Sequence, residues 1–553
     1  MRSLILSSTL LALTLASAAS SDTSVPTIRL DDGLFVGTTD GVTNSFLGIP
    51  FAKPPVGSLR FQVPQEHDKY NGTYNATVYG FSCPGLGTGM PNVTSGLQDL
   101  LDSVQNKQTP VDEDCLTLNV VVPKGTSPGA NLPVAVWIYG GGFFFGGSSM
   151  YPGEKIVQRS IELEEPVVYV SMNYRISGAA YLQLTCRLYI HHTHPAYGFL
   201  ASQELKDAGA TNLGLRDQRE ALKWVQKYVH LFGGDPAKVT IWGESSGALS
   251  ISFQMVTNGG NPEGLFRGAF IESGAPLPLG NYTQGQVAYD ALVNATNCTS
   301  ASSTLECLRE VPFDTLKEAI LDTTALVGLT PLVDFDFITE SPANATAQGR
   351  IANIPFVNGN CDDEGTEFTF LANVTTEEEV AVSLQNGLIP GAPTSAIDEI
   401  LSLYPSDPAA GSPFGTGDAN DIAPQYKRIA AILGDLNFQA PRRSMIQELS
   451  GRQPVWSYLF KRFKYLPIIG SGHESDIVTV YGPGDLTDYV VNFVNHLDPN
   501  NRTGIRWPQY TVHSPQLLTF WDGPEPRNIT NDTYRAEGIA LLAQLGAEFP
   551  TAA

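Results

Sequence analysis

The sequence predicts an α/β protein in which a large, mostly parallel sheet is covered by helices. Apolar, β-branched runs such as 134–139 and 238–242 have the length and composition of buried strands. Helical patterns such as 217–231 alternate with them, and this alternation favours parallel strands joined by helices. No low-complexity linker, repeat or charge run divides the 553 residues, so we expect one large domain with inserted loops over residues 19–553.

The most informative connection lies at Ser245. After the run 238–242 the chain reads Gly-Glu-Ser-Ser-Gly, which fits the pattern G-x-S-x-G, and a helix-compatible stretch follows. A strand, this pentad and a helix are typical of the nucleophile elbow of α/β hydrolases. The two glycines are expected to let the backbone turn sharply, so that the Ser245 hydroxyl projects toward a substrate carbonyl.

A serine nucleophile also needs a base, which follows it in the α/β-hydrolase order. His473, His496 and His513 come after Ser245. His496 lies in an amphipathic helical pattern, and His513 lies in an irregular segment without a flanking strand. His473 follows an apolar strand at 455–460 and a Gly-Ser-Gly loop that can bring an imidazole over the serine, so it is the predicted base.

The carboxylate that orients the base is expected at the end of a strand between the serine and the histidine. Residues 354–360 form such a strand, and Asp362, Asp363 and Glu364 follow it. Position alone leaves all three open.

Donors for an oxyanion are predicted after another strand. The buried pattern at 134–139 ends in Gly140-Gly141-Gly142-Phe143, an HGGG-type loop with Tyr139 in place of the histidine. Glycines there let backbone N–H groups approach a developing negative charge.

Together these motifs resemble the type-B carboxylesterase and lipase family of α/β hydrolases, which includes secreted fungal lipases and cholinesterases. The likeness covers nearly the whole mature chain and runs through 46–61, 113–119, the glycine loop, 173–175, 217–219, the elbow, 363–366 and 472–473.

The resemblance implies specific roles. It implies a triad of Ser245, Glu364 and His473, which selects Glu364 from the three carboxylates. It implies oxyanion N–H groups from Gly141, Gly142 and Ser246, although Ser246 stands where alanine is usual. It also implies disulfides Cys83–Cys115 and Cys298–Cys307, ion pairs Arg60–Glu113 and Arg175–Asp217, and a supporting hydroxyl at Ser273. Cys361 is expected to be a buried free thiol.

The implied function is hydrolysis of lipophilic carboxylic esters through an acyl-enzyme, without metal or cofactor. A more specific alternative is a triacylglycerol lipase activated at a lipid–water interface. A non-catalytic adhesion protein of the same fold would lack a triad member, and none is missing. A mis-assembled gene product that does not fold is a third alternative.

Several features predict an exported glycoprotein. Arg2, an apolar run at 4–15 and Ala16-Ser17-Ala18 read as a cleavable signal peptide over residues 1–18. No later segment is long and apolar enough to cross a bilayer. The formal charge of −23 argues against nucleic-acid partners. N-linked glycans are expected at the N-x-S/T sequons, which are Asn71, Asn75, Asn92, Asn281, Asn294, Asn297, Asn344, Asn373, Asn501, Asn528 and Asn531.

Residues 95–104 predict a short amphipathic helix with Leu97, Leu100, Leu101 and Val104 on one face. One interpretation is a face packed permanently on the body. The other is a lid that covers the site in water and turns outward at lipid.

The segment 178–196 is foreign to its surroundings. It holds His191, His192, His194 and an unmatched Cys186, but no Asp or Glu. A metal site is disfavoured because adjacent strand residues point to opposite faces and no carboxylate helps. A surface loop, with Cys186 bonded to Cys361, is a second interpretation. The favoured hypothesis is a retained intron, because deletion of the segment restores a family-like junction.

Overall fold

The computed structural model describes residues 25–85, 95–177, 197–322, 330–369, 374–482, 484–500 and 504–550. The predicted signal peptide, the segment 178–196 and three of the sequon asparagines (Asn92, Asn373 and Asn501) lie outside the described residues.

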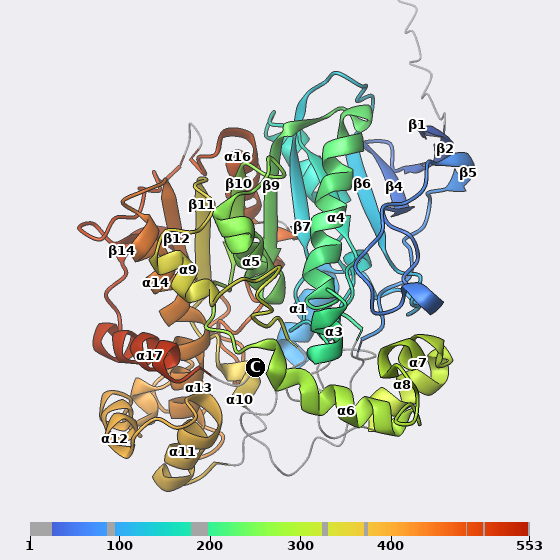
Figure 1. Ribbon diagram of the computed structural model, residues 1–553. Coiled ribbons are helices and arrows are strands. Elements are labelled where there is room, and N and C mark those ends of the chain that lie inside the picture. Colours follow the sequence, from blue (N-terminus) through green and yellow to red (C-terminus); the bar gives the residue numbers. More distant parts are fainter. Residues whose placement is uncertain are drawn as a thin grey trace, which may run out of the picture.

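The predicted mostly parallel sheet is present (Figure 1). It has eleven strands in the order β14-β13-β12-β11-β10-β9-β7-β8-β6-β4-β3. Strands β8, β7 and β9 to β13 run parallel to one another, and antiparallel strands extend both edges. A separate small sheet has the order β1-β2-β5.

The strand bounds agree to within two residues with the predicted runs 134–139, 354–360 and 455–460, whereas the run 238–242 lies inside a longer strand that begins at Gly234. The large sheet consists of β3 (Thr38–Thr39), β4 (Thr43–Pro50), β6 (Thr117–Pro123), β7 (Leu132–Ile138), β8 (Val168–Met172), β9 (Gly234–Glu244), β10 (Gly268–Glu272), β11 (Phe356–Cys361), β12 (Val455–Lys461), β13 (Gln516–Trp521) and β14 (Arg527–Asn531). The small sheet consists of β1 (Thr27–Leu30), β2 (Asp32–Val36) and β5 (Asn71–Asn75).

Helices cover both faces of the sheet, which is why its central strands are apolar without alternation. On one face α4 (Leu213–Tyr228), α5 (Ser246–Gly260), α9 (Pro342–Ala347) and α14 (Ala440–Leu449) pack on the strands or on one another. On the other face lie α2 (Gly153–Glu162) and α16 (Asp485–His496). All five residues of β8 and of β10 are buried between these layers.

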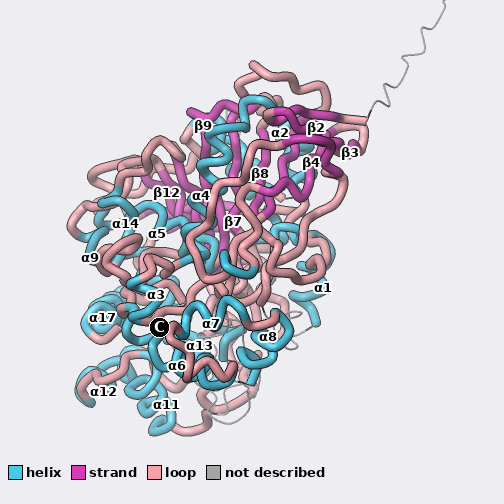
Figure 2. Tube along the Cα trace, turned by 45° about the vertical axis from the view of Figure 1, so that its right-hand side comes forward, coloured by secondary structure: helices cyan, strands magenta, loops and turns pink. Residues whose placement is uncertain are grey.

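Further helices gather beyond one end of the sheet, where Figure 2 shows strands in the upper part of the molecule and helices below them. They include α3 (Gln203–Asp207), α6 (Gln286–Ala295), α7 (Thr304–Glu310), α8 (Phe313–Asp322), α10 (Thr366–Thr369), α11 (Glu377–Ser383), α12 (Thr394–Leu403), α13 (Tyr426–Gly434) and α17 (Ala536–Glu548). Two apolar clusters beside the main core lie under them, one around Ile397 and Ile432 and one around Leu292 and Leu308.

The structure contains both disulfides that the family resemblance implied. Cys83 bonds to Cys115 and Cys298 bonds to Cys307, while Cys361 is buried and free. Both implied ion pairs also form: Arg60 Nε lies 2.5 Å from Glu113 Oε1, and Arg175 Nη2 lies 2.7 Å from Asp217 Oδ1. Buried pairs of this kind fix loop geometry because either partner alone would be an uncompensated buried charge.

The predicted amphipathic helix is α1 (Ser95–Val104), and its apolar face lies against the body. Leu97, Leu101 and Val104 are buried, Leu100 is partly buried, and α1 contacts α15 (Ile477–Val480). A fixed helix and a lid in its closed position both require this packing.

Candidate active site

The turn between β9 and α5 places Ser245 in a strained conformation with positive φ, at φ 54° and ψ −124°. The glycines on either side act by close packing and not by the turning predicted from the sequence. A Cβ on Gly243 would lie 2.5 Å from the carbonyl oxygen of Ile138, and one on Gly247 would lie 2.0 Å from the same atom. The backbone strain therefore lies at Ser245 itself. The two glycines, which have no Cβ, allow the turn between β9 and α5 to pack closely against β7.

Three side chains that lie far apart in the sequence meet at this turn. His473 Nε2 is 2.8 Å from Ser245 Oγ, and His473 Nδ1 is 2.6 Å from Glu364 Oε2. His473 and Glu364 are almost completely buried. The imidazole can therefore take a proton from the hydroxyl on one nitrogen while it donates to the carboxylate on the other.

Glu364 is held in place by donors of its own. Its Oε1 accepts hydrogen bonds from the Ser273 hydroxyl at 2.6 Å, from the Cys361 backbone N–H at 2.7 Å and from the Asn360 amide at 3.3 Å. These bonds leave Oε2 for the imidazole. The hydroxyl that the resemblance implied at Ser273 thus contacts the expected carboxylate.

The other two candidate carboxylates have different partners. Asp362 contacts Lys464 at 2.6 Å and Lys461 at 3.0 Å. Asp363 contacts the same Lys464 at 2.5 Å and accepts from the backbone N–H of Ser471. Burial opposes ionisation of Asp362, but the two ammonium groups hold the pKa of its carboxyl below the usual range. The geometry separates one carboxylate that meets the histidine from two that form a structural ion-pair cluster.

The remaining candidate histidines lie elsewhere. His496, at the end of α16, contacts Glu165 at 2.9 Å on the surface, and His513 lies in an exposed turn. Within the residues that the structure describes, no group of three or more His, Cys, Asp or Glu could hold a metal ion. The three histidines at 191, 192 and 194 are not among them.

Acidic groups surround His473. Burial opposes its protonation, yet Glu364, with contributions from Glu474 and Glu367, raises the pKa of the imidazole to about 9. Glu244, which precedes the serine, lies 3.2 Å from His473 Nε2 and is completely buried. Burial and the surrounding carboxylates raise the pKa of Glu244 well above its ordinary value.

The glycine loop lies beside the serine. Gly141 and Gly142 have φ values of 91° and 62°, and added Cβ atoms would collide with Phe145 and Phe144 respectively. Both glycines line the same cavity as Ser245 and Ser246, and Ser246 is the first residue of α5. The N-terminus of a helix carries a partial positive charge, so this wall favours a developing oxyanion.

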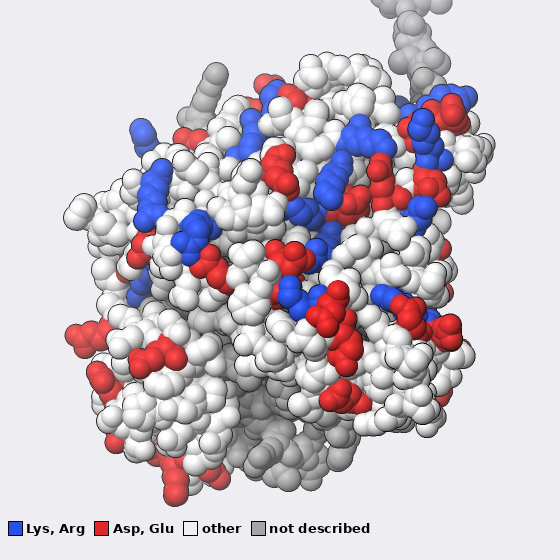
Figure 3. All heavy atoms as spheres, in the orientation of Figure 1, with Lys and Arg blue, Asp and Glu red and all other residues white. Residues whose placement is uncertain are grey.

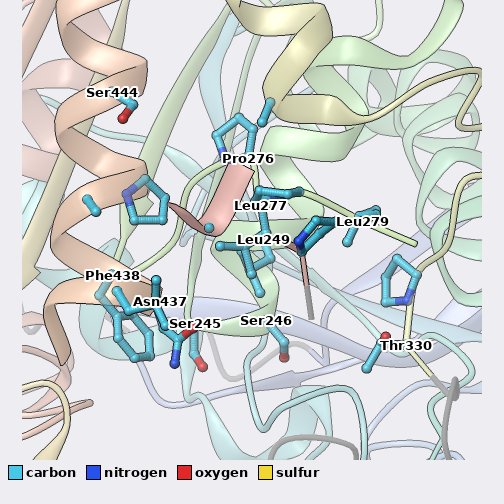
Figure 4. A pocket seen from close by; sticks show the side chains of 18 of the residues that line it. Ser245, Ser246, Leu249, Pro276, Leu277, Leu279, Thr330, Asn437, Phe438 and Ser444 are labelled. Carbon is cyan, nitrogen blue, oxygen red and sulfur yellow. The ribbon is translucent and has the colours of Figure 1, made fainter. Parts of the chain in front are cut away.

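The cavity has a volume of about 630 Å³, in the range of small-molecule sites. It extends from Ser245 and His473 to α9, α14 and α17, where the lining residues Asn344, Ser444 and Ala547 are exposed. Most of its wall is apolar, and Figure 4 shows Leu249, Leu277, Leu279 and Phe438 among its side chains. A hydrocarbon chain fits such a wall.

Comparison with known proteins identifies the family. The model of the carboxylesterase family matches residues 24–187 and 194–537. The chain belongs to the carboxylesterase family. This carboxylesterase is a carboxylic-ester hydrolase. The internal stretch that the family model leaves unmatched, 188–193, falls inside the segment 178–196.

Relatives of this carboxylesterase are fungal lipases. Lipase 4 of Diutina rugosa is 39% identical over 521 residues, which cover 89% of this chain and 90% of that protein. Secreted triacylglycerol lipase LIP1 of Gibberella zeae is 36% identical over 547 residues, which cover 94% and 90%. The crystal structure of Aspergillus niger EstA matches with a TM-score of 0.79 at 26% identity, covering 95% of this chain and 99% of that one. The fold is therefore the α/β-hydrolase fold.

Sequence reasoning missed several side chains at the site of this carboxylesterase. Glu244 and Glu474 are direct neighbours of Ser245 and His473 in the sequence, and this adjacency was an available signal. No sequence signal marked Asn437 or Phe438. They reach the cavity from a helix segment whose irregular winding is not visible in the residue pattern.

Proposed function

We propose that the chain is a secreted hydrolase of lipophilic carboxylic esters that uses Ser245, His473 and Glu364 as a catalytic triad. The main support for this proposal is the continuous hydrogen-bonded path from Ser245 Oγ through both nitrogens of His473 to Glu364. The apolar cavity that begins at Ser245 supports the preference for lipophilic substrates.

In the proposed mechanism Ser245 Oγ attacks the ester carbonyl carbon as His473 Nε2 takes the hydroxyl proton. The backbone N–H groups of Gly141, Gly142 and Ser246 stabilise the oxyanion, and Glu364 stabilises the imidazolium. His473 then gives the proton to the leaving alcohol. Water, deprotonated by the same imidazole, attacks the acyl-enzyme, releases the carboxylic acid and restores the serine.

Surface features support secretion. All eight described sequon asparagines are exposed, namely Asn71, Asn75, Asn281, Asn294, Asn297, Asn344, Asn528 and Asn531. Acidic and basic side chains are interspersed over the upper part of the face in Figure 3, and most of the charged side chains in its lower part are acidic. In the part of the chain that the structure describes, no helix has the length and apolar character of a membrane span.

A triacylglycerol lipase is the more specific candidate. One relative, LIP1 of Gibberella zeae, carries that name, and α1 supplies an amphipathic helix whose apolar face lies on the body. Activation at an interface would require this face to turn outward.

The test of the triad is the Ser245→Ala variant, purified and assayed against p-nitrophenyl esters of increasing chain length. We expect turnover to fall by about 10⁴-fold or more, and an organophosphate to label the wild-type protein on Ser245 only. Labelling at another residue, or full activity in the variant, would refute the assignment. Glycosidase digestion of the exported protein tests secretion separately.

A further inference from the structure

The wall of the cavity beside the triad is built on an irregular helix. Helices α13 and α14 are joined by a π-helical turn, Asp435–Gln439, and such turns are frequent at functional sites. The wider winding brings three consecutive residues, Leu436, Asn437 and Phe438, to the cavity wall, where a regular helix would turn one of them away.

The turn is held firmly on both flanks. Asp435 accepts hydrogen bonds from Arg535 at 2.7 Å and from Tyr404 at 2.8 Å. Gln439 donates to the Cys361 carbonyl at 2.8 Å, beside the turn that carries Glu364. The ring of Phe438 lies 4.7 Å from that of His473. The side chains between these anchors are therefore presented to the reacting groups in a fixed geometry.

Asn437 is the unusual member of this set. Its amide nitrogen is buried and has no hydrogen-bond partner among the described residues, although it lines the same cavity as Ser245. The neighbouring wall residues Leu436 and Phe438 are apolar, and Figure 4 shows the Asn437 side chain entering the cavity from the same side as Phe438. An unsatisfied buried donor is unfavourable, and a bound acceptor would remove that penalty.

We propose that Asn437 forms a polar subsite that donates a hydrogen bond to an oxygen atom on the acyl chain of the substrate. The inference rests on the proposed function and deepens it. The enzyme then favours alkoxy-, hydroxy- or oxo-substituted acyl esters over plain alkyl esters of the same length. A site with a fixed hydrogen-bond donor strongly rejects a substrate analogue that lacks the acceptor atom. An apolar pocket rejects a substrate with one extra polar atom less strongly.

The acyl side of the ester is assigned from the course of the reaction. The acyl group stays attached to Ser245 through both halves of the reaction, whereas the alcohol leaves after the first. A contact with the acyl chain can therefore act on both steps.

The experiment uses pairs of p-nitrophenyl esters that differ only by exchange of one CH₂ for O. The pairs are pentanoate with 3-methoxypropanoate and hexanoate with 4-methoxybutanoate, and the measured quantity is the ratio of kcat/KM within each pair. Because the leaving group is shared, the change in this ratio between wild type and Asn437→Leu cancels differences in intrinsic reactivity. We expect the leucine variant to lower the oxygen-to-alkyl ratio about tenfold in at least one pair.

Asn386→Leu is the matched control, because Asn386 lines the same cavity but is exposed. It should leave both ratios unchanged. Asn437→Asp, which keeps the size but removes the amide donor, should lower the ratio as leucine does. If the leucine variant does not fold, Asn437→Ala gives the same readout.

Unchanged ratios in active Asn437 variants would overturn the subsite and leave the proposed function intact. A change confined to the alcohol side, measured with butyl and 2-methoxyethyl butanoates, would also overturn it. Lack of turnover of every ester by the wild-type enzyme would refute the proposed function, and the subsite with it.

Discussion

The hydroxyl of Ser177 accepts a hydrogen bond from the backbone N–H of Phe199 at 2.7 Å, across 22 positions of sequence. The N–H of Gly198 contacts both this hydroxyl at 3.2 Å and the carbonyl of Ile176 at 3.1 Å. The two flanks of the segment 178–196 therefore meet directly. Arg175 and Asp217, on either side of the segment, also form their ion pair.

The first prediction follows from this contact. Replacement of residues 178–196 by a single alanine should leave Ser177 and the turn at Tyr197 in place, because the flanks already touch. We expect the shortened protein to be exported in higher yield than the full-length chain and to hydrolyse esters. Export yield and kcat/KM of both forms measure this.

The retained-intron hypothesis has an independent test. Transcript reads should lack codons 178–196 in most mature messages. A peptide that begins at Leu188 in the exported enzyme would show that the segment is genuine and the hypothesis wrong.

The second prediction separates the three carboxylates that follow β11. Glu364→Gln keeps the size of the side chain but removes the charge opposite the imidazolium, so kcat should fall by about 10⁴-fold with little change in Tm. Asp362→Asn leaves Lys461 and Lys464 without their common partner. Because these lysines are partly exposed, we expect a loss of about 1–2 kcal/mol in the free energy of unfolding, with kcat within about tenfold of wild type.

Thermal unfolding and steady-state kinetics on both variants check this division. The pH dependence of stability gives a further control. The pKa of Asp362 is depressed in the folded state, so its contribution is present above an unfolded pKa of about 3.9 and is lost as pH falls. As the pH falls below about 4, the Asp362→Asn variant should therefore lose less stability than wild type. Equal kinetic defects in the two variants would contradict the assignment.

The sequence predicted most of the fold because its signals are local. The runs at 134–139 and 455–460 are buried on both faces of the sheet, and a continuous apolar run is the direct consequence of that burial. The proposed triad needed more than local signals. Position left Asp362, Asp363 and Glu364 equivalent, and the family resemblance chose among them.

What the sequence could not supply depends on contacts between distant segments. The pairing of Lys464 with two aspartates involves residues about a hundred positions apart in the chain. The roles of Gly243 and Gly247 depend on the carbonyl of Ile138 in another strand. The π-helical turn at Asp435–Gln439 occurs within an ordinary helical pattern, so nothing marked Asn437 as a cavity residue.

The third prediction concerns α1. If this helix is a lid, activity on a short triglyceride should rise sharply once droplets form. The reason is that the apolar face of α1 would leave the body of the protein and bind to the lipid surface. Leu100→Ser is the better single change, since Leu100 is only partly buried while Leu101 belongs to the packed core. It should weaken the rise without unfolding the protein. A smooth saturating curve through the solubility limit would instead show an esterase with a fixed helix.

The fourth prediction concerns the charge of Glu474, which follows the base and lines the cavity. The general base must be neutral to accept a proton, and the pKa of His473 is raised to about 9. Activity, measured as kcat/KM, should therefore rise with pH toward about 9. Burial raises the pKa of Glu474 itself, but this carboxylate contributes to the elevation of the histidine pKa when it is ionised.

Glu474→Gln removes that negative charge at constant size, so the imidazolium loses part of its stabilisation and the pKa of His473 should fall. The acid limb of the pH profile of kcat/KM should then move to lower pH. The matched control is Glu448→Gln, because Glu448 lines the same cavity but is exposed, and the acid limb of its pH profile should not move. If the acid limb of the pH profile does not move in the Glu474→Gln variant, or moves to higher pH, this carboxylate does not raise the pKa of His473.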